Sequence, residues 1–393
     1  MTQLRIGLAG AGVRGRDLSS LIQRADLPAT VVAVADPQPG AIGWAKNEFG
    51  DQAQVFSDFR ELPSVGLDAV LVTSPDYTHE PIAIAMLGAG IPVFLEKPMA
   101  ITTAGCDGVL RAAMESRTPL YVGHNMRLSP LVKAMREVIE TGRIGEVKSI
   151  WCRHFVGHGG DFYFKDWHAD RTKSTGLLLQ KGVHDIDVIH WLASGVTRRT
   201  SAFGTLAVYG QIEDRRDRTG ELMWDWLDPE NNWPPLAATG LNPVVDVEDL
   251  SLVNLELDNG VLACYQQCHF TPDYWRNFTV IGTEGRLENF GNGDGAVVKV
   301  WRSRSEYRDD SDEQVIVHAE GTDHGGSDRK ILTEFLSFVQ GDLLAPTTSP
   351  LGAREAVAAG VAATDSVRAM GRVMEITPPA ADLTAYFTSA IPT

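Results

Sequence analysis

The sequence has few cysteines, no long apolar run and no excess of positive charge, and each shortage excludes a class of protein. The 4 cysteines among 393 residues are scattered, at Cys106, Cys152, Cys264 and Cys268. They are too dispersed for a disulfide framework, and no second pair completes the spacing of a metal site. We therefore expect free thiols and no bound metal. No apolar run approaches the roughly 20 residues that span a membrane, so we expect no membrane-embedded segment.

The charge balance is strongly acidic. Asp and Glu number 51 against 35 Lys and Arg, which gives a formal net charge of −16. Surfaces that bind nucleic acid or anionic lipid need clustered Lys and Arg, so we expect neither a nucleic acid nor a membrane as partner. The first strand-like run begins at Leu4, which leaves no room for a signal peptide. A cytoplasmic location is the expectation that follows.

The first third of the chain alternates between strand-like and helix-like runs. This alternation predicts parallel βαβ units in a doubly wound sheet, that is, a Rossmann domain. A chain of 393 residues is too long for one ordinary core, so we expect a first domain at 1–125 and a second at 126–393. The expected strands lie near 4–9, 30–36, 68–73, 91–95 and 119–123, and the expected helices near 14–24, 40–48, 78–88, 103–116 and 130–141.

Beyond Gly145 the pattern becomes that of an α+β domain, built on a large, mostly antiparallel open sheet with a few helices. Apolar and polar residues alternate over several stretches, as they do in half-exposed strands. Asp258-Asn259-Gly260 between two of these stretches predicts a hairpin turn. The alternating stretches are 147–155, 250–257, 261–270 and 296–301, and the expected helices lie near 181–193, 327–340 and 352–370.

Two stretches do not fit this pattern. Residues 210–246 carry Trp224, Trp226 and Trp233, and a loop of this length inside a compact domain is usually functional or disordered. So many aromatic side chains favour order, either as the lining of a cleft or as a contact between subunits. The charged stretch 303–314 is expected to be solvated.

A glycine-rich turn, Gly10-Ala11-Gly12-Val13-Arg14-Gly15, follows the first strand and opens the first helix. In this context the first glycine permits a tight turn, the second lets a pyrophosphate approach the backbone, and the third allows close helix packing. Asp36 ends the second strand about 20 residues further on, where a ribose-binding carboxylate is expected. Asp36 would accept both ribose hydroxyls and repel a 2′-phosphate, so we expect NAD rather than NADP.

Glu96-Lys97-Pro98 ends the strand expected at 91–95, at the edge where open α/β sheets bind ligands. Lys97 is therefore a candidate acid or base. Four further motifs and one strand-end turn accompany this tripeptide. They are Thr73-Ser74-Pro75-Asp76-Tyr77-Thr78-His79, Gly123-His124-Asn125-Met126-Arg127, Gly182-Val183-His184-Asp185-Ile186-Asp187, Val247-Glu248-Asp249 and Gly282-Thr283-Glu284-Gly285.

In this order the motifs resemble the Gfo/Idh/MocA family of NAD(P)-dependent sugar and polyol oxidoreductases, over nearly the whole chain. The resemblance implies a Rossmann domain followed by an α+β domain whose open sheet mediates oligomers, here a homodimer or homotetramer. It also implies that Lys97 contacts the reacting hydroxyl or carbonyl, that Glu96 helps to hold the cofactor and Lys97, and that His184 is a second acid or base. An ordinary His pKa of about 6.5 would place an ionisation near pH 6–7.

The expected contacts form two sets. NAD is expected to contact Gly10, Gly12, Val13, Arg14, Asp36, Ser74, Pro75, His79, Glu96, Lys97, Asn125 and Trp167. The carbohydrate substrate is expected to contact Lys97, Arg127, Arg153, His154, Trp167, Gln180, Lys181 and His184.

One position departs from the family pattern, because Gln180 stands where Asp is commoner, four residues before His184. An amide cannot accept a proton, which puts the usual carboxylate–imidazole relay in question, although Asp187 could orient the ring. Lys181 either adds positive charge to the pocket or faces solvent. The locally basic segment 153–173 either recognises an anionic or polyhydroxylated sugar, with Trp167 stacked on the sugar or the nicotinamide, or is a solvated loop.

Three functions are compatible with these residues. The first is an NAD-dependent dehydrogenase that oxidises a secondary hydroxyl of a sugar, glycoside or inositol-like polyol, with Lys97 or His184 taking the proton. The second is a glycosidase that uses NAD to oxidise a glycoside transiently, eliminates the aglycone, adds water and returns the hydride. The third is a non-catalytic NAD-sensing protein, which the presence of both Lys97 and His184 disfavours.

Overall fold

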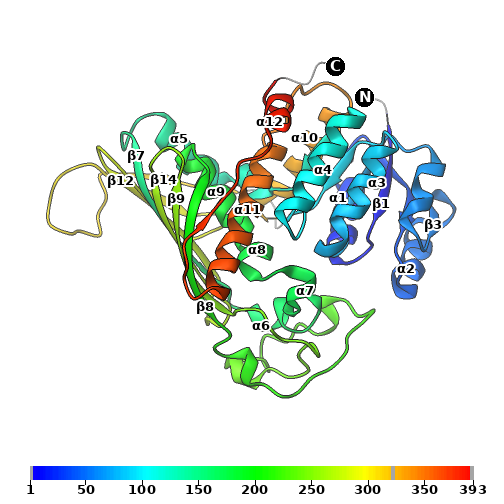
Figure 1. Cartoon of the computed structure of the whole chain (residues 1–393), viewed down its shortest axis with the longest axis horizontal. Helices are drawn as coiled ribbons and strands as arrows, with labels where there is room; N and C mark the ends of the chain where they lie inside the picture. The colour runs from blue at the N-terminus through cyan, green and yellow to red at the C-terminus, as the bar shows by residue number, and fades with distance from the viewer. Residues whose placement is uncertain (1–2, 320–323, 390–393) are drawn as a thin grey trace.

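The computed structural model describes residues 3–319 and 324–389, which build two sheets with their helices (Figure 1). The first sheet has six parallel strands in the order β3-β2-β1-β4-β5-β6, the order of a doubly wound nucleotide-binding sheet. The predicted Rossmann architecture is thereby confirmed. The strands are β1 (Leu4–Ala9), β2 (Ala29–Ala35), β3 (Gln54–Phe56), β4 (Ala69–Val72), β5 (Val93–Leu95) and β6 (Leu120–Val122).

Helices cover both faces of this sheet. Every residue of β4 is buried, as in parallel strands that are covered on both sides. Short helical turns, η3 (Asp76–Thr78) and η4 (Asn125–Leu128), follow β4 and β6 at the edge where ligands bind in such sheets. The longer helices of this part are α1 (Val13–Arg24), α2 (Pro39–Phe49), α3 (His79–Gly88) and α4 (Thr103–Ser116).

The second sheet has nine strands in the order β14-β13-β12-β11-β7-β10-β9-β8-β15. Neighbours are antiparallel except β7 and β10, so the predicted mostly antiparallel sheet is confirmed. The predicted turn at 258–260 joins β9 to β10. The strands are β7 (Val147–Phe155), β8 (Thr197–Thr205), β9 (Leu250–Leu257), β10 (Leu262–Cys268), β11 (Trp275–Gly282), β12 (Arg286–Phe290), β13 (Val297–Trp301), β14 (Glu313–Ile316) and β15 (Met374–Glu375).

The two faces of the nine-stranded sheet differ. On the inner face, α5 (Pro130–Glu140) and α9 (Gly182–Ala193) pack against buried side chains such as Ile150 and Cys152. The outer face carries a row of exposed apolar side chains. They include Trp151, Phe203, Leu252, Leu262 and Ile281.

The end of the chain returns to the first domain. Phe335 of α10 (Ser327–Val339) packs its ring against Phe94 and Tyr121 of the first sheet. Helix α11 (Pro350–Arg368) lies between the two sheets and contacts α4, α9 and β8, and α12 (Ala381–Thr388) contacts α4 (Figure 1). In the described part of the chain, no helix has the length and hydropathy that a membrane crossing requires.

The Trp-rich stretch 210–246 is anchored by Asp161 of α6 (Gly159–Tyr163). The Asp161 carboxylate lies 2.8 Å from the Lys165 ammonium and accepts a 2.7 Å hydrogen bond from Asn232. Its backbone carbonyl accepts a 2.9 Å hydrogen bond from the Trp226 indole. The stretch therefore packs on the segment that leads to α7 (Arg171–Ser174) and α8 (Leu177–Gln180). The charged stretch 303–314 is largely exposed, as predicted, but its last two residues begin β14.

Candidate functional site

The glycine turn lies where β1 meets α1, against the end of β4. Gly10 has a φ of +97°, and a Cβ on it would lie 2.5 Å from the backbone nitrogen of Ser74. A Cβ on Gly15 would lie 2.2 Å from the Gly10 carbonyl oxygen, so both positions require glycine. The Cβ position of Gly12 has nothing within 4 Å. Open space therefore lies before the N–H groups at the start of α1, which fits a pyrophosphate.

Asp36 ends β2 beside this turn. Its Oδ2 accepts a hydrogen bond from the backbone of Ala11 and its Oδ1 from that of Gln38, both at 2.8 Å. Each oxygen keeps a second lone pair and the residue is partly exposed, so the carboxylate can still accept ribose hydroxyls. The turn and the carboxylate together fit the adenosine and pyrophosphate parts of NAD.

Arg14 connects the turn to the end of β5. Its guanidinium donates to Glu96 at 2.6 Å and to both oxygens of Asp328 at 2.8 and 2.9 Å. The other Glu96 oxygen accepts from the backbone N–H of Lys97 at 3.0 Å. Asn125 donates to Asp328 at 2.9 Å, and its own Oδ1 is buried without a partner. That orphaned oxygen fits a donor such as the carboxamide of nicotinamide.

His79 links two loops at the ends of β4 and β5. Its Nδ1 lies 2.7 Å from the Pro98 carbonyl oxygen and its Nε2 lies 2.8 Å from that of Ser74. The ring is buried, so it is placed to hold these loops together. Ser74 and Pro75 are partly exposed beside the glycine turn.

Lys97 projects from the first domain toward the second. Its ammonium donates to the backbone carbonyl of Gln180 in α8 at 3.1 Å. Burial lowers the pKa of Lys97 to about 8, the Lys181 ammonium lowers it as well, and Asp76 and Glu96 oppose the shift. A lysine whose pKa lies this close to neutrality can both accept and return a proton.

Lys181 is half-buried between two tyrosine rings. Its Nζ lies 5.7 Å from the ring centroid of Tyr163 and 6.0 Å from that of Tyr274. Burial lowers the pKa of Lys181, but the two phenols outweigh it and raise the pKa above its ordinary value. Lys181 therefore stays charged beside the less basic Lys97.

His184 is partly exposed and lies near His124, with ring centroids 6.2 Å apart. Its Nδ1 is buried without a hydrogen-bond partner. Burial and then the cations of Lys97 and Lys181 lower the pKa of His184 well below its ordinary value. The sequence predicts an ionisation near pH 6–7, whereas these surroundings favour the neutral imidazole.

A buried polar network lies on the inner face of the second sheet, around Asp185, the residue that follows His184. The Asp185 carboxylate pairs with Arg276 at 2.5 Å and accepts hydrogen bonds from His154 and from the Tyr265 hydroxyl, both at 2.8 Å. Burial and then Arg276 lower the pKa of His154 to about 4. His154 is 0% exposed, so it supports the site from below and does not line its surface.

Two predicted substrate contacts are not brought to this site. The alternation of β7 sends Arg153 to the outer face, where its guanidinium lies 4.9 Å from the Trp151 ring centroid and 5.2 Å from that of Trp275. Arg127 is engaged by Asp187 through hydrogen bonds of 2.8 and 2.7 Å, both buried. Asp187 thus neutralises Arg127. Asp187 is therefore unavailable to orient the His184 ring, although the sequence predicted that it could.

Trp167 lies where the second domain meets the first, in the turn η5 (Trp167–Ala169). Its ring stacks on His168, with centroids 3.7 Å apart, and meets Tyr77 of the first domain edge-on at 6.1 Å. Tyr77 is 41% exposed. The two domains therefore present aromatic rings to each other across the opening.

Asp76, Tyr274 and Arg276 were absent from the predicted contacts. Asp76 is buried and acts electrostatically on Lys97, and its only signal was its place directly after a strand end. Tyr274 directly precedes β11 and Arg276 is its second residue, and the sequence did not indicate this strand. Among the described residues, no group of three or more His, Cys, Asp and Glu is arranged to hold a metal, and the four cysteines are free.

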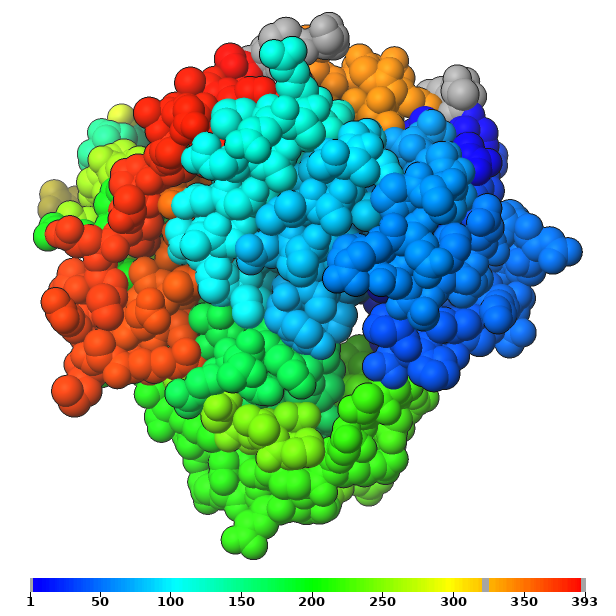
Figure 2. Space-filling view, turned by 45° about the vertical axis from the view of Figure 1, so that its right-hand side comes forward, coloured from blue at the N-terminus to red at the C-terminus, as the bar shows by residue number. Residues whose placement is uncertain are grey.

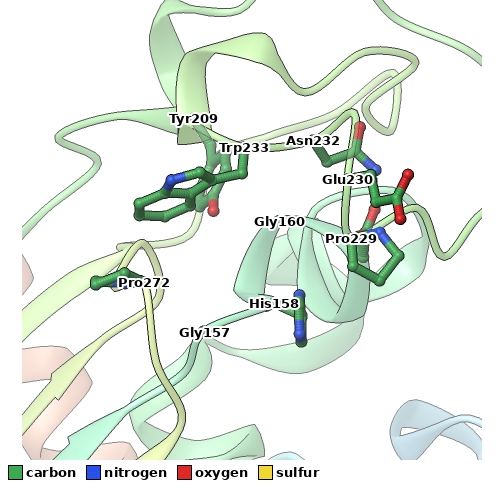
Figure 3. A pocket seen from close by; sticks show the side chains of 10 residues that line it. Gly157, His158, Gly160, Tyr209, Pro229, Glu230, Asn232, Trp233 and Pro272 are labelled. Atoms are coloured by element: carbon green, nitrogen blue, oxygen red, sulfur yellow. The ribbon is translucent and has the colours of Figure 1, made fainter.

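A pocket of about 470 Å³ lies outside this group, between α6 and the Trp-rich stretch. Figure 3 shows Trp233 and Pro272 on one side of it and Pro229 and Glu230 on the other, with His158 between them. None of the predicted site residues lines this pocket. The Trp-rich stretch therefore builds a hollow of its own, separate from Lys97.

A Rossmann domain with an open glycine turn and, at the end of β5, a lysine of lowered pKa is the arrangement expected of an NAD-binding oxidoreductase. Residues 4–124 match the model of the oxidoreductase family with an NAD-binding Rossmann fold. Residues 132–288 match the model of the GFO/IDH/MocA C-terminal domain. The chain belongs to the Gfo/Idh/MocA family, and NAD is the cofactor of its first domain.

Curated relatives include inositol dehydrogenases. Inositol 2-dehydrogenase 2 of Saccharopolyspora erythraea is 35% identical over 191 residues, which are 48% of this chain and 53% of that enzyme. The chain thus aligns with about half of that enzyme's length. YteT of Bacillus subtilis (strain 168), provisionally named an oxidoreductase, is 26% identical over 311 residues, 69% of this chain and 73% of that protein.

Solved structures show the same fold. Myo-inositol 2-dehydrogenase from Lactobacillus plantarum has a TM-score of 0.72 at 16% identity, covering 96% of this chain and 100% of that one. GenD2 from gentamicin A biosynthesis, solved in complex with NAD, has a TM-score of 0.71 at 22% identity, covering 96% and 97%.

Proposed function

We propose that the chain is a dehydrogenase that oxidises a secondary hydroxyl of a sugar, glycoside or inositol-like polyol with NAD. The observation that carries the proposal is Lys97, which reaches from the cofactor domain to Gln180 with a pKa of about 8. When bound, NAD supplies the acceptor for the hydride from the carbon that bears the hydroxyl. The chain supplies the groups that position the hydroxyl and take its proton.

The proton goes to Lys97 in this proposal. At neutral pH a small but usable fraction of Lys97 is the free amine, which can accept the hydroxyl proton. Lys181 keeps its charge and favours negative charge that develops on the oxygen. His184 is neutral and supplies a hydrogen bond to substrate, because its lowered pKa makes it a weak base.

The substrate class is supported by the aromatic side chains where the two domains meet. Trp167 and Tyr77 offer aromatic faces and edges that suit the C–H groups of a sugar or cyclitol ring. The names of the inositol dehydrogenases among the relatives favour the same class. Arg153 and Arg127 are engaged elsewhere, and His154 is fully buried against Asp185. We therefore assign substrate contacts to Lys97, Trp167, Gln180, Lys181 and His184.

A stoichiometric assay tests the proposal. The full chain is incubated with NAD and a panel of inositols, free sugars and aryl glycosides, and both NADH absorbance and released aglycone are followed. We expect NADH to accumulate in proportion to substrate, with no aglycone released. Absence of NADH with every member of the panel would contradict a dehydrogenase for this class.

The oxidoreductive glycosidase is the second candidate, and one observation favours it. The Trp-rich stretch reaches the first domain beside Asp36, since a Cβ on Gly220 would lie 3.5 Å from the Gln38 side-chain oxygen. Figure 2 shows the green second-domain surface meeting the blue first-domain surface next to an opening between them. A bridge at the adenosine end would retain NAD through many turnovers. Released aglycone without net NADH would identify this reaction.

We also propose that two or four copies associate through the outer face of the second sheet. Trp151, Phe203, Leu252 and Leu262 are each roughly half exposed or more there, at 47, 63, 51 and 57%. Several large apolar side chains exposed on one sheet face favour an interface there. Light scattering of the purified chain is expected to give a dimer or tetramer, and Leu252→Glu is expected to weaken it.

A further inference from the structure

The pocket between α6 and the Trp-rich stretch has no part in the proposed oxidation. Its volume of about 470 Å³ lies within the range of small-molecule sites, roughly 300–1,000 Å³. Trp233 and Pro272 line one side, Glu230 lines the other, and His158 lies between them (Figure 3). The hollow is therefore large enough for a small organic molecule, and it has both apolar and polar walls.

The walls of the pocket are held in place by buried interactions. The Asp161 carboxylate, 3% exposed, accepts a 2.7 Å hydrogen bond from the Asn232 side chain. The Tyr209 hydroxyl donates to the His269 carbonyl oxygen at 2.9 Å, and its ring stacks on Phe164 with centroids 4.4 Å apart. The pocket is therefore formed before any molecule enters it.

Two glycines bring the backbone of the floor close to the neighbouring walls. A Cβ on Gly157 would lie 2.9 Å from the backbone of Asp273, and a Cβ on Gly160 would lie 2.8 Å from the Tyr209 ring. Side chains at these positions would push the walls apart. The shape of the pocket therefore depends on bare backbone at Gly157 and Gly160.

The exposed groups of the pocket suit a ring that has one apolar face and a hydroxylated edge. The Trp233 side chain is 44% exposed and offers an aromatic surface to C–H groups. Asn232 spends its N–H on Asp161, so its oxygen can still accept a hydrogen bond. Among the described residues, no group forms a hydrogen bond with the side chains of Glu230 and His158. An anion would meet the Glu230 carboxylate, and a wholly apolar molecule would cover these polar groups without pairing them.

The pocket adjoins the candidate site through two shared segments. His158 precedes α6 and Tyr163 ends it, a separation of about 7 Å along a helix. The Lys181 ammonium lies 5.7 Å from the Tyr163 ring centroid and 6.0 Å from that of Tyr274, two residues after Pro272. Tyr274 is 44% exposed. Helix α6 and residues 272–274 thus each contribute one residue to the pocket and another to the surroundings of Lys181.

We propose that this pocket is a subsite for a second sugar ring of an extended substrate. One face of that ring packs on the Trp233 indole, and its hydroxyls donate to the Glu230 carboxylate and to the Asn232 oxygen. This inference rests on the proposed function, because it selects two-ring sugars from the proposed substrate class. It leaves the oxidation itself at Lys97.

Disaccharide binding to the NAD-loaded full chain tests the inference without turnover. Calorimetric titration gives Kd for maltose, cellobiose and lactose, and for their component rings glucose and galactose. We expect at least one disaccharide to bind roughly tenfold more tightly than its component rings, and Trp233→Ala to abolish that advantage, as loss of an aromatic anchor does. Trp224→Ala is the matched control, because Trp224 is 56% exposed in the same stretch and lies outside the pocket.

Two further variants keep the test decisive. Trp233→Tyr keeps an aromatic face and should retain most of the advantage, and Glu230→Ala should weaken disaccharides about threefold through a lost hydrogen bond. Glu230→Ala answers the question if Trp233→Ala does not fold. The inference is overturned if no disaccharide binds more tightly than its component rings, or if the advantage survives in folded Trp233→Ala or in folded Glu230→Ala.

The kinetics separate this inference from the dehydrogenase proposal. With a disaccharide that yields NADH, Trp233→Ala should raise KM roughly tenfold and leave kcat unchanged, because the lost contact stabilises bound substrate and transition state equally. KM for a single-ring substrate should stay the same. Disaccharide binding that depends on Trp233 without any NADH would contradict the dehydrogenase alone, whereas NADH formation with equal KM changes for one and two rings would contradict the subsite alone.

Discussion

The two walls of the candidate site, one from each domain, differ in their charged groups and in how these groups are held. The cofactor wall consists of the glycine turn and the carboxylates of Asp36, Glu96 and Asp328, which are held by backbone amides and Arg14. The substrate wall carries Lys181 and His184 near Lys97, and the buried Arg276–Asp185–His154 network lies behind them. Acidic groups suit ribose hydroxyls, whereas cations make Lys97 a weaker base. The division of charge therefore separates binding of the nucleotide from transfer of the proton.

The largest expected effect on turnover comes from removing the Lys97 side chain, which reaches from the first wall to Gln180 in the second. Lys97→Ala should lower kcat by roughly 10²- to 10⁴-fold, the usual contribution of a positioned acid or base. NAD affinity and thermal stability should change little, because the Lys97 side chain does not hold the glycine turn. Turnover on the best substrate of the panel and NAD titration measure the two effects. Lys148→Ala, at an exposed lysine paired with Glu146, is the control. Near-normal turnover by Lys97→Ala would show that Lys97 is not the proton acceptor.

The next effect belongs to the cofactor wall alone. Asp36→Ala should weaken NAD by about 1.5–3 kcal/mol, the value of hydrogen bonds to a charged acceptor, or roughly 10- to 100-fold in Kd. Binding of NADP should not weaken in parallel, since the carboxylate repels a 2′-phosphate. Calorimetric titration with both nucleotides measures the change in preference. Equal affinity of the wild-type chain for NAD and NADP would refute this assignment of Asp36.

A smaller effect should come from the charge of the substrate wall. Lys181→Met removes a positive neighbour, so the pKa of Lys97 should rise above about 8. A rise of roughly 1 unit would shift the rising limb of kcat against pH to higher pH and lower kcat at neutral pH about tenfold. Lys173→Met, a lysine near Asp170 with 43% of its side chain exposed, should leave the limb in place. A shift to lower pH would contradict the electrostatic role of Lys181.

The smallest effect is expected from a residue next to the substrate wall in sequence but on the other side of the sheet. Arg153→Ala should change kcat by no more than about twofold, as for substitutions remote from the chemistry. Steady-state kinetics on the same substrate measures it. A loss as large as that in Lys181→Met would mean that the outer face of the sheet communicates with the cleft.

The contrast between the two walls also explains which parts of the fold and of the site could be predicted from the sequence. Gly10, Gly12 and Asp36 were assigned from the sequence because each acts through its own backbone or at the end of its own strand. The first sheet was largely recognised, except for the short β3, because its buried strands are continuous apolar runs. In the second sheet, β8 carries Arg198 and Arg199, and such polar strands resemble loops in sequence.

The substrate wall could not be assembled from local signals. Arg276 reaches the Asp185 network because β11 pairs with β7 in a register that places Arg276 opposite His154. The register between strands so far apart in sequence is set by tertiary packing, so no local sequence pattern predicts it. The lowered pKa of His184 has the same origin, since it depends on burial and on cations from other elements.

The ion pair between Arg14 and Asp328 has a consequence for how the protein matures. The two residues are 314 positions apart, and α10, which contains Asp328, also covers the aromatic rings of Phe94 and Tyr121. Domains generally fold during synthesis as soon as their residues have emerged, N-terminal units first. Here the nucleotide-binding unit emerges early but lacks its last carboxylate and part of its apolar cover until the ribosome has translated α10. A chain that stops before α10 would therefore expose that surface, so a half-finished copy is open to capture by chaperones and proteases while a finished one is closed to them.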